Sequence, residues 1–257
     1  MTMRNRTRHP SARGRTASVL SLPLLAALTL SGGCGAGEDG TDPAPSATSP
    51  TTAAASSSPS DRPSPTGDAK VVIPTSAFVE LPPELRKMPR RATPTEQALP
   101  KLCGNEFGTG GRQVTASASM TVTYKQPGDD PTYVPQGMIH QTIFTFAGEG
   151  AADYVRRVRD SVEACPSYVR AGESVTVESR PLPGVGDEAV LLTRTWPQAH
   201  PDGERTGGDA TSQIAVIRVD GVATVLDDQG WEGTSGSPAV LDRVAREAVR
   251  AIEAWQR

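Results

Sequence analysis

The chain has 257 residues, with 26 Lys or Arg against 29 Asp or Glu, and its formal net charge is −3. From Val71 onward, 19 basic residues stand against 24 acidic ones, and this acidic balance argues against nucleic acid as a partner. The sequence contains no phosphate-binding loop, dinucleotide-binding fingerprint or zinc-protease motif. We therefore expect no cofactor and no metal.

Residues 1–33 have the order of a secretion signal. Five arginines lie between residues 4 and 15, an apolar run follows from Val19 to Leu30, and small residues lead up to Cys34. A helix over the apolar run would rise about 18 Å, which is less than the hydrocarbon core of about 30 Å. The segment is therefore predicted to be a signal peptide and not a permanent span.

The stretch Leu28–Cys34 resembles a bacterial lipobox, in which cleavage precedes a cysteine that carries a diacylglyceryl group. It departs from the usual pattern at Ser31, where an aliphatic residue is common; Leu30 lies one residue further out. The resemblance implies a lipidated, palmitate-bearing Cys34 that anchors the protein to the extracytoplasmic face of the cell membrane. The alternative is an ordinary signal cleaved nearby, which would leave Cys34 as a free thiol.

Residues 34–70 carry this cysteine and a linker. From Gly35 to Lys70 there is no aromatic or large aliphatic residue, and Ser, Thr, Pro and Ala dominate. Such a segment cannot bury enough apolar surface to offset the entropy of ordering, so we expect a disordered linker. It would hold one globular domain, residues 71–257, roughly 35 Å from the anchor.

Two segments of this domain have helical periodicity. Apolar side chains recur at three- and four-residue steps over Ala151–Val162 and again over Leu241–Trp255. Ser237 is the expected N-cap of the second helix, with Pro238 at its first position. A shorter helix is predicted over Pro83–Met88.

Most of the remaining domain has the composition of strands. The predicted strands are Gln113–Tyr124, Gly137–Phe146, Ser174–Arg180, Glu188–Trp196, Thr211–Val219 and Val222–Leu226. Asp220-Gly221 between the last two predicts a tight hairpin, because this dipeptide suits a turn that needs positive φ. The order of strands and helices predicts an α+β fold, an antiparallel β-sheet with helices packed on one face.

Cys103 and Cys165 are the two remaining cysteines. In an oxidising compartment, a pair of cysteines in one domain most simply forms a disulfide, and Cys165 falls on the apolar side of the first helix. The alternative is two buried free thiols. A zinc site is not expected, because the two cysteines are 62 residues apart and no paired histidine lies near them.

No catalytic residue is predicted. Gly233–Pro238 superficially resembles the nucleophile loop of trypsin-like proteases, but neither His140 nor His200 has the surroundings of that family's base. The loop is better interpreted as the start of the final helix. Asp129-Asp130 and Asp227-Asp228 are interpreted as solvated acid pairs at turns, since no third ligand has calcium-site spacing.

The chain resembles one known family in the order of its parts. Cys103 is followed by a strand-rich stretch, Ala151–Tyr154 opens a helix that ends at Cys165, and Pro183–Ala189 precedes a strand with Ile217–Val219. This resembles the extracellular sensor domain of PknH-type bacterial serine/threonine kinases, which also occurs on stand-alone actinobacterial lipoproteins.

The resemblance covers Val71–Arg257, and its most specific piece is Gly184–Ala189. It implies a cleft between sheet and helices that binds an unidentified ligand. The kinase domain usually carries two disulfides, whereas this chain has cysteines for one. There is no kinase part here, so the resemblance implies that a partner would relay any signal.

These observations predict a lipid-anchored binding or sensor-like domain without catalytic activity. Its ligand would be a small molecule, a glycan or a lipid held in an apolar cleft. Trp196 and Trp231, near loops at predicted strand ends, are the candidate ligand contacts; the alternative is that both pack in the core. Two other functions stay open, a cell-wall hydrolase and a structural or protein-contact lipoprotein of the envelope.

Overall fold

The computed structural model of the chain describes residues 71–109, 112–200 and 203–257. The predicted signal peptide, Cys34 and the linker lie outside the described residues. The elements are η1 (Thr75–Ala77), β1 (Arg86–Ala92), α1 (Thr95–Ala98), β2 (Val114–Tyr124), β3 (Gly137–Phe146), α2 (Gly150–Glu163), β4 (Ser167–Arg170), β5 (Glu173–Pro181), β6 (Glu188–Ala199), β7 (Arg205–Val219), β8 (Val222–Gly230), η2 (Trp231–Gly233) and α3 (Pro238–Gln256). Among the described residues, no helix is both long enough and apolar enough to cross a bilayer.

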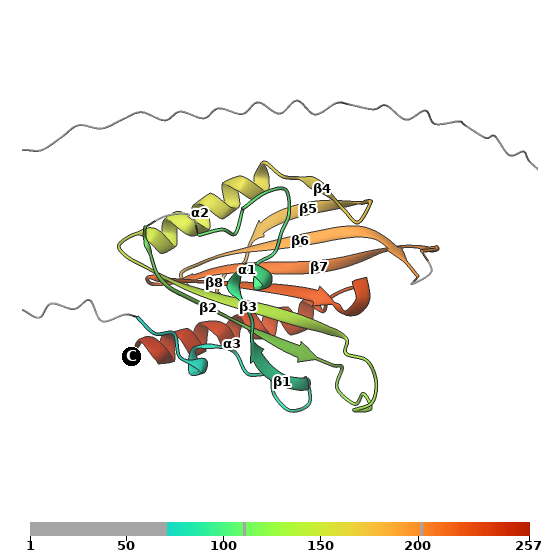
Figure 1. Ribbon diagram of the computed structural model, residues 1–257, viewed down its shortest axis with the longest axis horizontal. Coiled ribbons are helices and arrows are strands. Elements are labelled where there is room, and N and C mark those ends of the chain that lie inside the picture. Colours follow the sequence, from blue (N-terminus) through green and yellow to red (C-terminus); the bar gives the residue numbers. More distant parts are fainter. Residues whose placement is uncertain (1–70, 110–111, 201–202) are drawn as a thin grey trace, which may run out of the picture. The chain divides into compact units, whose positions relative to one another are not determined.

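One antiparallel sheet of eight strands organises the domain, in the order β1-β2-β3-β8-β7-β6-β5-β4 (Figure 1). The last hairpin, β7–β8, occupies the centre and pairs on both sides, with β3 and with β6. Its turn is the predicted one, and Asp220 has a φ of +50° there. The centre of the sheet is therefore built by residues that come late in the chain.

The two long helices cover opposite faces of the sheet. Ile214 and Val216 of β7 pack with Tyr154, Val155 and Val158 of α2. Their neighbours Ala215 and Ile217 belong to the cluster of α3, which contributes Leu241, Val244, Ala245, Ala248 and Ile252. Since successive strand residues point to opposite faces, α2 and α3 lie on different sides. The predicted α+β fold with helices against an antiparallel sheet is confirmed, but the two long helices do not share one face.

The ends of the two long helices follow from local chemistry. The Ser237 hydroxyl accepts from the backbone N–H of Val240 at 3.4 Å and Pro238 is the first helical residue, as predicted. The helix α2 ends at Glu163, three residues before Pro166. The short helix predicted over Pro83–Met88 is wrong, because a turn there leads directly into β1.

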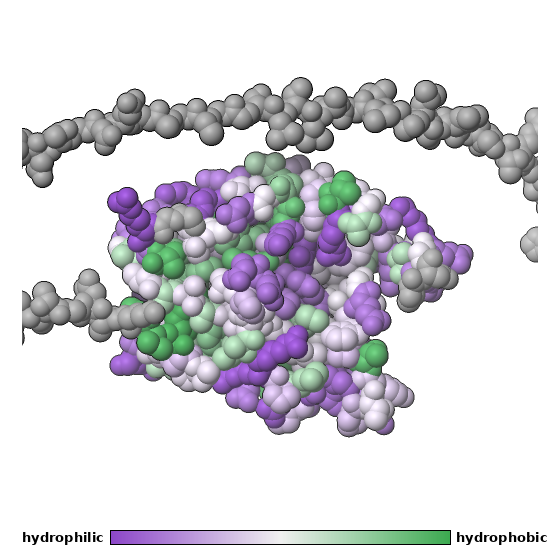
Figure 2. All heavy atoms as spheres, viewed as in Figure 1, coloured by the Kyte–Doolittle hydropathy of each residue, from purple (hydrophilic) through white to green (hydrophobic). Residues whose placement is uncertain are grey.

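The face seen in Figure 2 carries hydrophobic residues in separate small groups, with hydrophilic residues between them. Large apolar residues that are exposed in the described part of the chain are few: Val71, Val72, Met88, Tyr133, Val134 and Val169. Scattered apolar residues of this kind are normal on a soluble surface. A binding site is therefore to be sought in the cavities between the elements.

Candidate functional site

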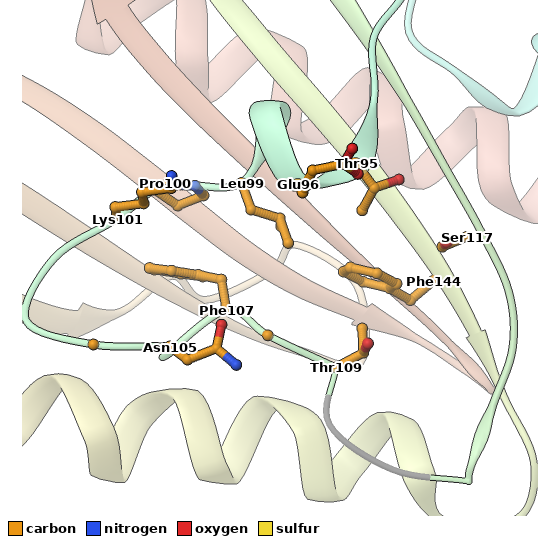
Figure 3. A pocket seen from close by; sticks show the side chains of 12 residues that line it. Thr95, Glu96, Leu99, Pro100, Lys101, Asn105, Phe107, Thr109, Ser117 and Phe144 are labelled. Atoms are coloured by element: carbon orange, nitrogen blue, oxygen red, sulfur yellow. The ribbon is translucent and has the colours of Figure 1, made fainter. Parts of the chain in front are cut away.

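A cavity of about 480 Å³ lies between α1, the segment 99–109 and the strands β2 and β3; we call it the loop cavity. Its apolar lining comes from Leu99, Phe107 and Phe144, and Figure 3 shows Leu99 and Phe144 pointing toward one another from opposite sides. Its polar lining comes from Thr95, Glu96, Lys101, Asn105, Thr109 and Ser117. The volume lies within the range of small-molecule sites, about 300–1,000 Å³.

The floor of the loop cavity belongs to the core. Phe107 and Phe144 are each only 1% exposed and join the cluster that α2 covers. The charged residues Glu96 and Lys101, by contrast, lie on the exposed part of the lining. A ligand with an apolar body and a polar or charged edge suits such a lining.

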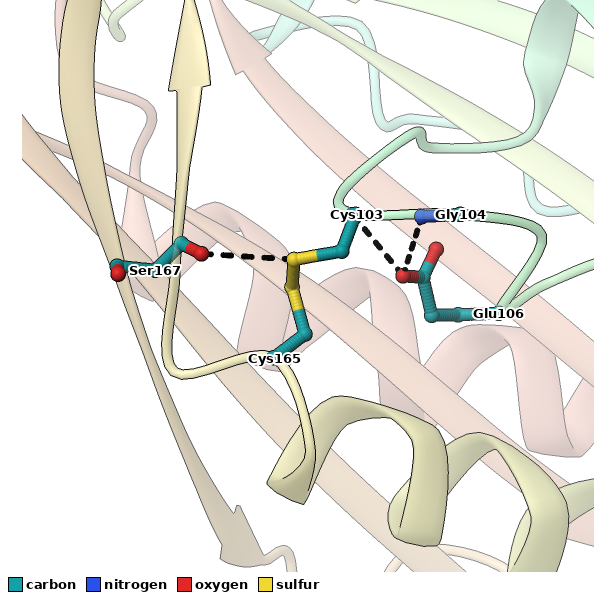
Figure 4. Close-up of a disulfide and its surroundings, with 5 residues drawn as sticks. All are labelled: Cys103, Gly104, Glu106, Cys165 and Ser167. Atoms are coloured by element: carbon teal, nitrogen blue, oxygen red, sulfur yellow. Dashed lines mark hydrogen bonds between the residues drawn. A yellow bond between two sulfur atoms is a disulfide. The ribbon is translucent and has the colours of Figure 1, made fainter.

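As predicted, Cys103 and Cys165 form a disulfide. It fixes one end of the segment 103–108, which lines one wall of this cavity. The cysteines are 62 residues apart in sequence, and their Cα atoms are 6.1 Å apart. The carboxylate of Glu106 accepts from the backbone N–H groups of Cys103 and Gly104, at 2.9 and 2.7 Å (Figure 4). Glu106 therefore orders the turn that carries the first cysteine.

The same wall is held to α2 by two further side chains. The Tyr154 hydroxyl donates to the carbonyl of Phe107 at 3.0 Å, and Arg157 donates to the carbonyl of Gly108 at 2.5 Å. Burial raises the pKa of Tyr154 far above its usual range, so this hydroxyl stays protonated as a donor. With the disulfide, three contacts to α2 and its end hold the segment 103–108 over the sheet.

Cys103, Glu106 and Cys165 bring ligand-type atoms within 4.8 Å of one another. A metal needs the thiolate form of cysteine, however, and both sulfurs here are joined in the disulfide. The second carboxylate oxygen of Glu106 is buried with no hydrogen-bond partner in the described part of the chain. Cys103, Glu106 and Cys165 therefore have a structural role, because their bonds fix the turn at Cys103 to the end of α2.

The two tryptophans predicted as ligand contacts do not line the loop cavity. Trp196 is 9% exposed and lies on the sheet face that α2 covers in part, with the Arg170 guanidinium 4.7 Å from its ring centre. Trp231 opens η2, and its indole Nε1 is buried without a partner among the described residues. Trp196 lines a smaller cavity that shares no residue with the loop cavity.

The loop Gly233–Pro238 has the structural role predicted for it. The Ser235 hydroxyl accepts from the backbone N–H of Thr211 at 3.1 Å, and Ser237 caps α3. His200 is followed directly by residues outside the described part of the chain. In the described part of the chain, both serine hydroxyls accept from backbone N–H groups and neither is bonded to a histidine.

His140 lies within β3, opposite Asp227 of β8, and its Nδ1 is 2.8 Å from the Thr121 hydroxyl. Burial lowers the pKa of His140 from its ordinary value, so the neutral ring is favoured. The Thr121 hydroxyl is buried and is also 2.7 Å from that of Thr93. None of the cavities described here is lined by His140 or Thr121.

The interpretation of Asp227-Asp228 as a solvated turn is wrong, because both residues lie within β8 and are completely buried. Asp227 pairs with Arg194 at 2.5 Å on the α2 side. Asp228 accepts from the Tyr124 hydroxyl and from the backbone N–H of Ser237, each at 2.7 Å, on the α3 side. Asp129-Asp130, by contrast, does form an exposed turn, in which Asp130 accepts from Thr132.

Desolvation inside the sheet raises the pKa of Asp228 to about 7, although its two hydrogen bonds favour the charged form. Burial and the neighbouring Asp228 together raise the pKa of Tyr124 far above its usual range. The Asp228 carboxyl therefore titrates near neutral pH. The same carboxyl accepts from the backbone N–H of Ser237, the residue before α3.

No protein-family model and no curated protein matches the chain. A solved structure does: the extracellular domain of PknH from Mycobacterium tuberculosis. The two chains superpose with a TM-score of 0.41 at 15% sequence identity, over 65% of this chain and 78% of that one. This is a similarity of structure at low sequence identity.

Proposed function

We propose that the chain is a lipid-anchored protein of the extracytoplasmic membrane face, whose domain binds a small amphipathic ligand in the loop cavity. The observation that carries the proposal is the lining of that cavity, which combines an apolar floor with a charged and polar opening. Three contacts to α2 and its end hold one wall before any ligand arrives, and preformed walls reduce the entropy cost of binding.

The membrane anchor in this proposal rests on the lipobox-like stretch at Cys34. The disulfide supports export, because disulfides persist mainly in oxidising compartments. Replacing Cys34 with Ala tests the anchor in the native host. The variant is expected to leave the membrane fraction for the soluble exported fraction, and unchanged retention would contradict lipidation.

Binding in the loop cavity can be tested with the dye 1-anilinonaphthalene-8-sulfonate, which has an apolar ring system and a single anionic group. We expect saturable fluorescence enhancement with the full chain. Ser117→Phe should weaken the dye about tenfold or more, because its new ring would occupy part of the cavity. Ser179→Phe is the matched control, since Ser179 is also exposed on a strand and does not line the cavity.

The natural ligand can be sought by native mass spectrometry of the full chain purified from its own host. A mass increment that is present in the wild type and Ser179→Phe but absent in Ser117→Phe would support the proposal. In the dye titration, equal affinity of the wild type, Ser117→Phe and Ser179→Phe would contradict it.

The proposal also holds that the domain binds without reacting. In support, the Thr121 hydroxyl beside His140 is buried and already bonded to two partners. Asp227, the carboxylate opposite His140, is bonded to Arg194 and Gln229 instead. Incubation of the full chain with purified cell-wall peptidoglycan is expected to release no soluble fragments; release that depends on His140 would favour the hydrolase alternative.

A further inference from the structure

A second cavity, of about 180 Å³, lies at the ends of β6, β7 and β8, on the sheet face that α2 covers only in part. The side chains that line it are Arg170, Arg194, Trp196, Ser212, Gln229 and Thr234, together with two glycines. We call it the arginine cavity. None of its residues lines the loop cavity.

The lining of the arginine cavity carries two positive charges and no carboxylate. Arg194 is only 3% exposed, and Asp227, which lies outside the lining, compensates its charge. The second cation, Arg170, is exposed and forms no ion pair among the described residues. The cavity therefore has one positive charge in excess.

Arg194 is fixed in place by its own hydrogen bonds. Its Nε donates to the Ser212 hydroxyl at 2.8 Å, and its Nη2 donates to Asp227 and to the carbonyl of Asp228, at 2.5 and 3.2 Å. Its Nη1 has no partner within the described ranges of the chain. A guanidinium held at Nε and Nη2 keeps its Nη1 group in one orientation, which lowers the entropy cost of binding there.

Trp196 supports Arg170 and is not a free stacking surface. The guanidinium carbon of Arg170 lies 4.7 Å from the ring centre, which is cation–π geometry. Because this cation covers the ring, a sugar would have to displace it in order to stack. The arrangement instead holds a second guanidinium at the mouth of the cavity.

We propose that the arginine cavity binds a carboxylate, either a small organic acid or the acid end of a larger molecule. A planar guanidinium matches the two oxygens of a carboxylate, and such charge-assisted hydrogen bonds are among the strongest in proteins. The cavity is smaller than sites for drug-sized ligands, which occupy about 300–1,000 Å³, so only a small group enters it. Gln229 and Thr234 supply further polar groups around it.

The test uses sodium acetate and the tryptophan fluorescence of the full chain, at constant ionic strength set with sodium chloride. Acetate is expected to cause a saturable change in the millimolar range, about 1–10 mM. Trp196→Phe should abolish that change, which assigns it to this cavity. Arg170→Gln should weaken acetate binding about tenfold or more, because it removes a charge-assisted hydrogen bond.

Arg156→Gln is the matched control, because Arg156 is an exposed arginine on α2 that does not line the cavity. This variant should bind acetate as the wild type does. Three results would overturn the proposal: no saturable response to acetate, an unchanged affinity in Arg170→Gln, or inorganic phosphate binding as tightly as acetate. The outcome is independent of the loop cavity, since Ser117→Phe is expected to leave the acetate response unchanged.

Discussion

The carboxylate of Asp187 accepts a hydrogen bond from the backbone N–H of Asp220 at 2.7 Å, across 33 residues of sequence. Asp187 also pairs with Arg218, and its own N–H donates to the carbonyl of Arg218 at 2.9 Å. Glu188, the next residue, bonds to Arg159 of α2. The segment Gly184–Ala189 therefore binds the turn of the central hairpin and joins it to α2.

Gly186→Ala should destabilise the domain more than Gly184→Ala. Both glycines have positive φ, +62° and +73°, which costs a residue with a Cβ about 1–2 kcal/mol. At Gly186 the added Cβ would also lie 2.4 Å from the carbonyl oxygen of Arg218, while at Gly184 it would meet nothing within 4 Å. Urea unfolding of the two variants measures the difference, and equal losses would contradict the contact.

Asp228 should make the stability of the domain depend on pH. Its folded-state pKa of about 7 is above the ordinary value of 3.8, so between these pH values the folded protein holds a proton that the unfolded chain has lost. The free energy of unfolding should therefore fall as pH rises from about 4 to about 7, by up to about 4 kcal/mol, and then level off.

Asp228→Asn removes this titration, and its free energy of unfolding should change less over the same pH range. Asp242→Asn, an exposed change on α3, is the control and should keep the pH dependence of the wild type. Urea unfolding at pH 4, 5, 6, 7 and 8 tests the prediction. Parallel curves for the wild type and Asp228→Asn would refute the assignment.

The effects of removing the two partners of the Arg194–Asp227 ion pair should not be additive. Asp227→Ala leaves a buried guanidinium without its counter-charge, and we expect a loss of about 3–5 kcal/mol. The double variant Arg194→Met, Asp227→Ala should lose less than the sum of the two single changes. Asp153→Ala, which removes an exposed pair with Arg156, should cost less than about 1 kcal/mol.

Removing the disulfide should lower stability and loosen one wall of the loop cavity. Replacing Cys103 and Cys165 with Ser frees a loop with a sequence separation of 62 residues, for which the chain-entropy relation gives about 4 kcal/mol. Thermal unfolding measures the loss, and hydrogen exchange should increase within residues 103–108. Unchanged exchange there would mean that Tyr154 and Arg157 alone hold the segment.

The spacing of apolar residues and the turn dipeptide predicted the elements that bury only one side. The helix α2, the helix α3 with its cap at Ser237, and the hairpin at Asp220 were all found where expected. The sequence also carries a signal for the two-sided burial of the sheet. Ile214–Ile217 is a continuous apolar run, which is typical of a strand covered on both faces.

Other parts could not be predicted, because their partners are distant in sequence. The strand β1 contains Pro89 and four basic residues, and it forms only because it pairs with β2 at the edge of the sheet. Asp227-Asp228 has the composition of a turn, and its burial depends on Arg194, Tyr124 and the start of α3. The loop cavity likewise forms from residues that have no common pattern.

The adjacent carboxylates of β8 also determine the register in which that strand pairs with its neighbours. A shift by a single residue would turn Asp227 toward the α3 side and Asp228 toward the guanidinium side, and every apolar neighbour would change sides with them. Asp227 would then lose its ion pair with Arg194, and Asp228 would lose its hydrogen bonds from Tyr124 and Ser237. Two consecutive aspartates at the middle of the sheet thus make misaligned pairing of the last hairpin costly during folding.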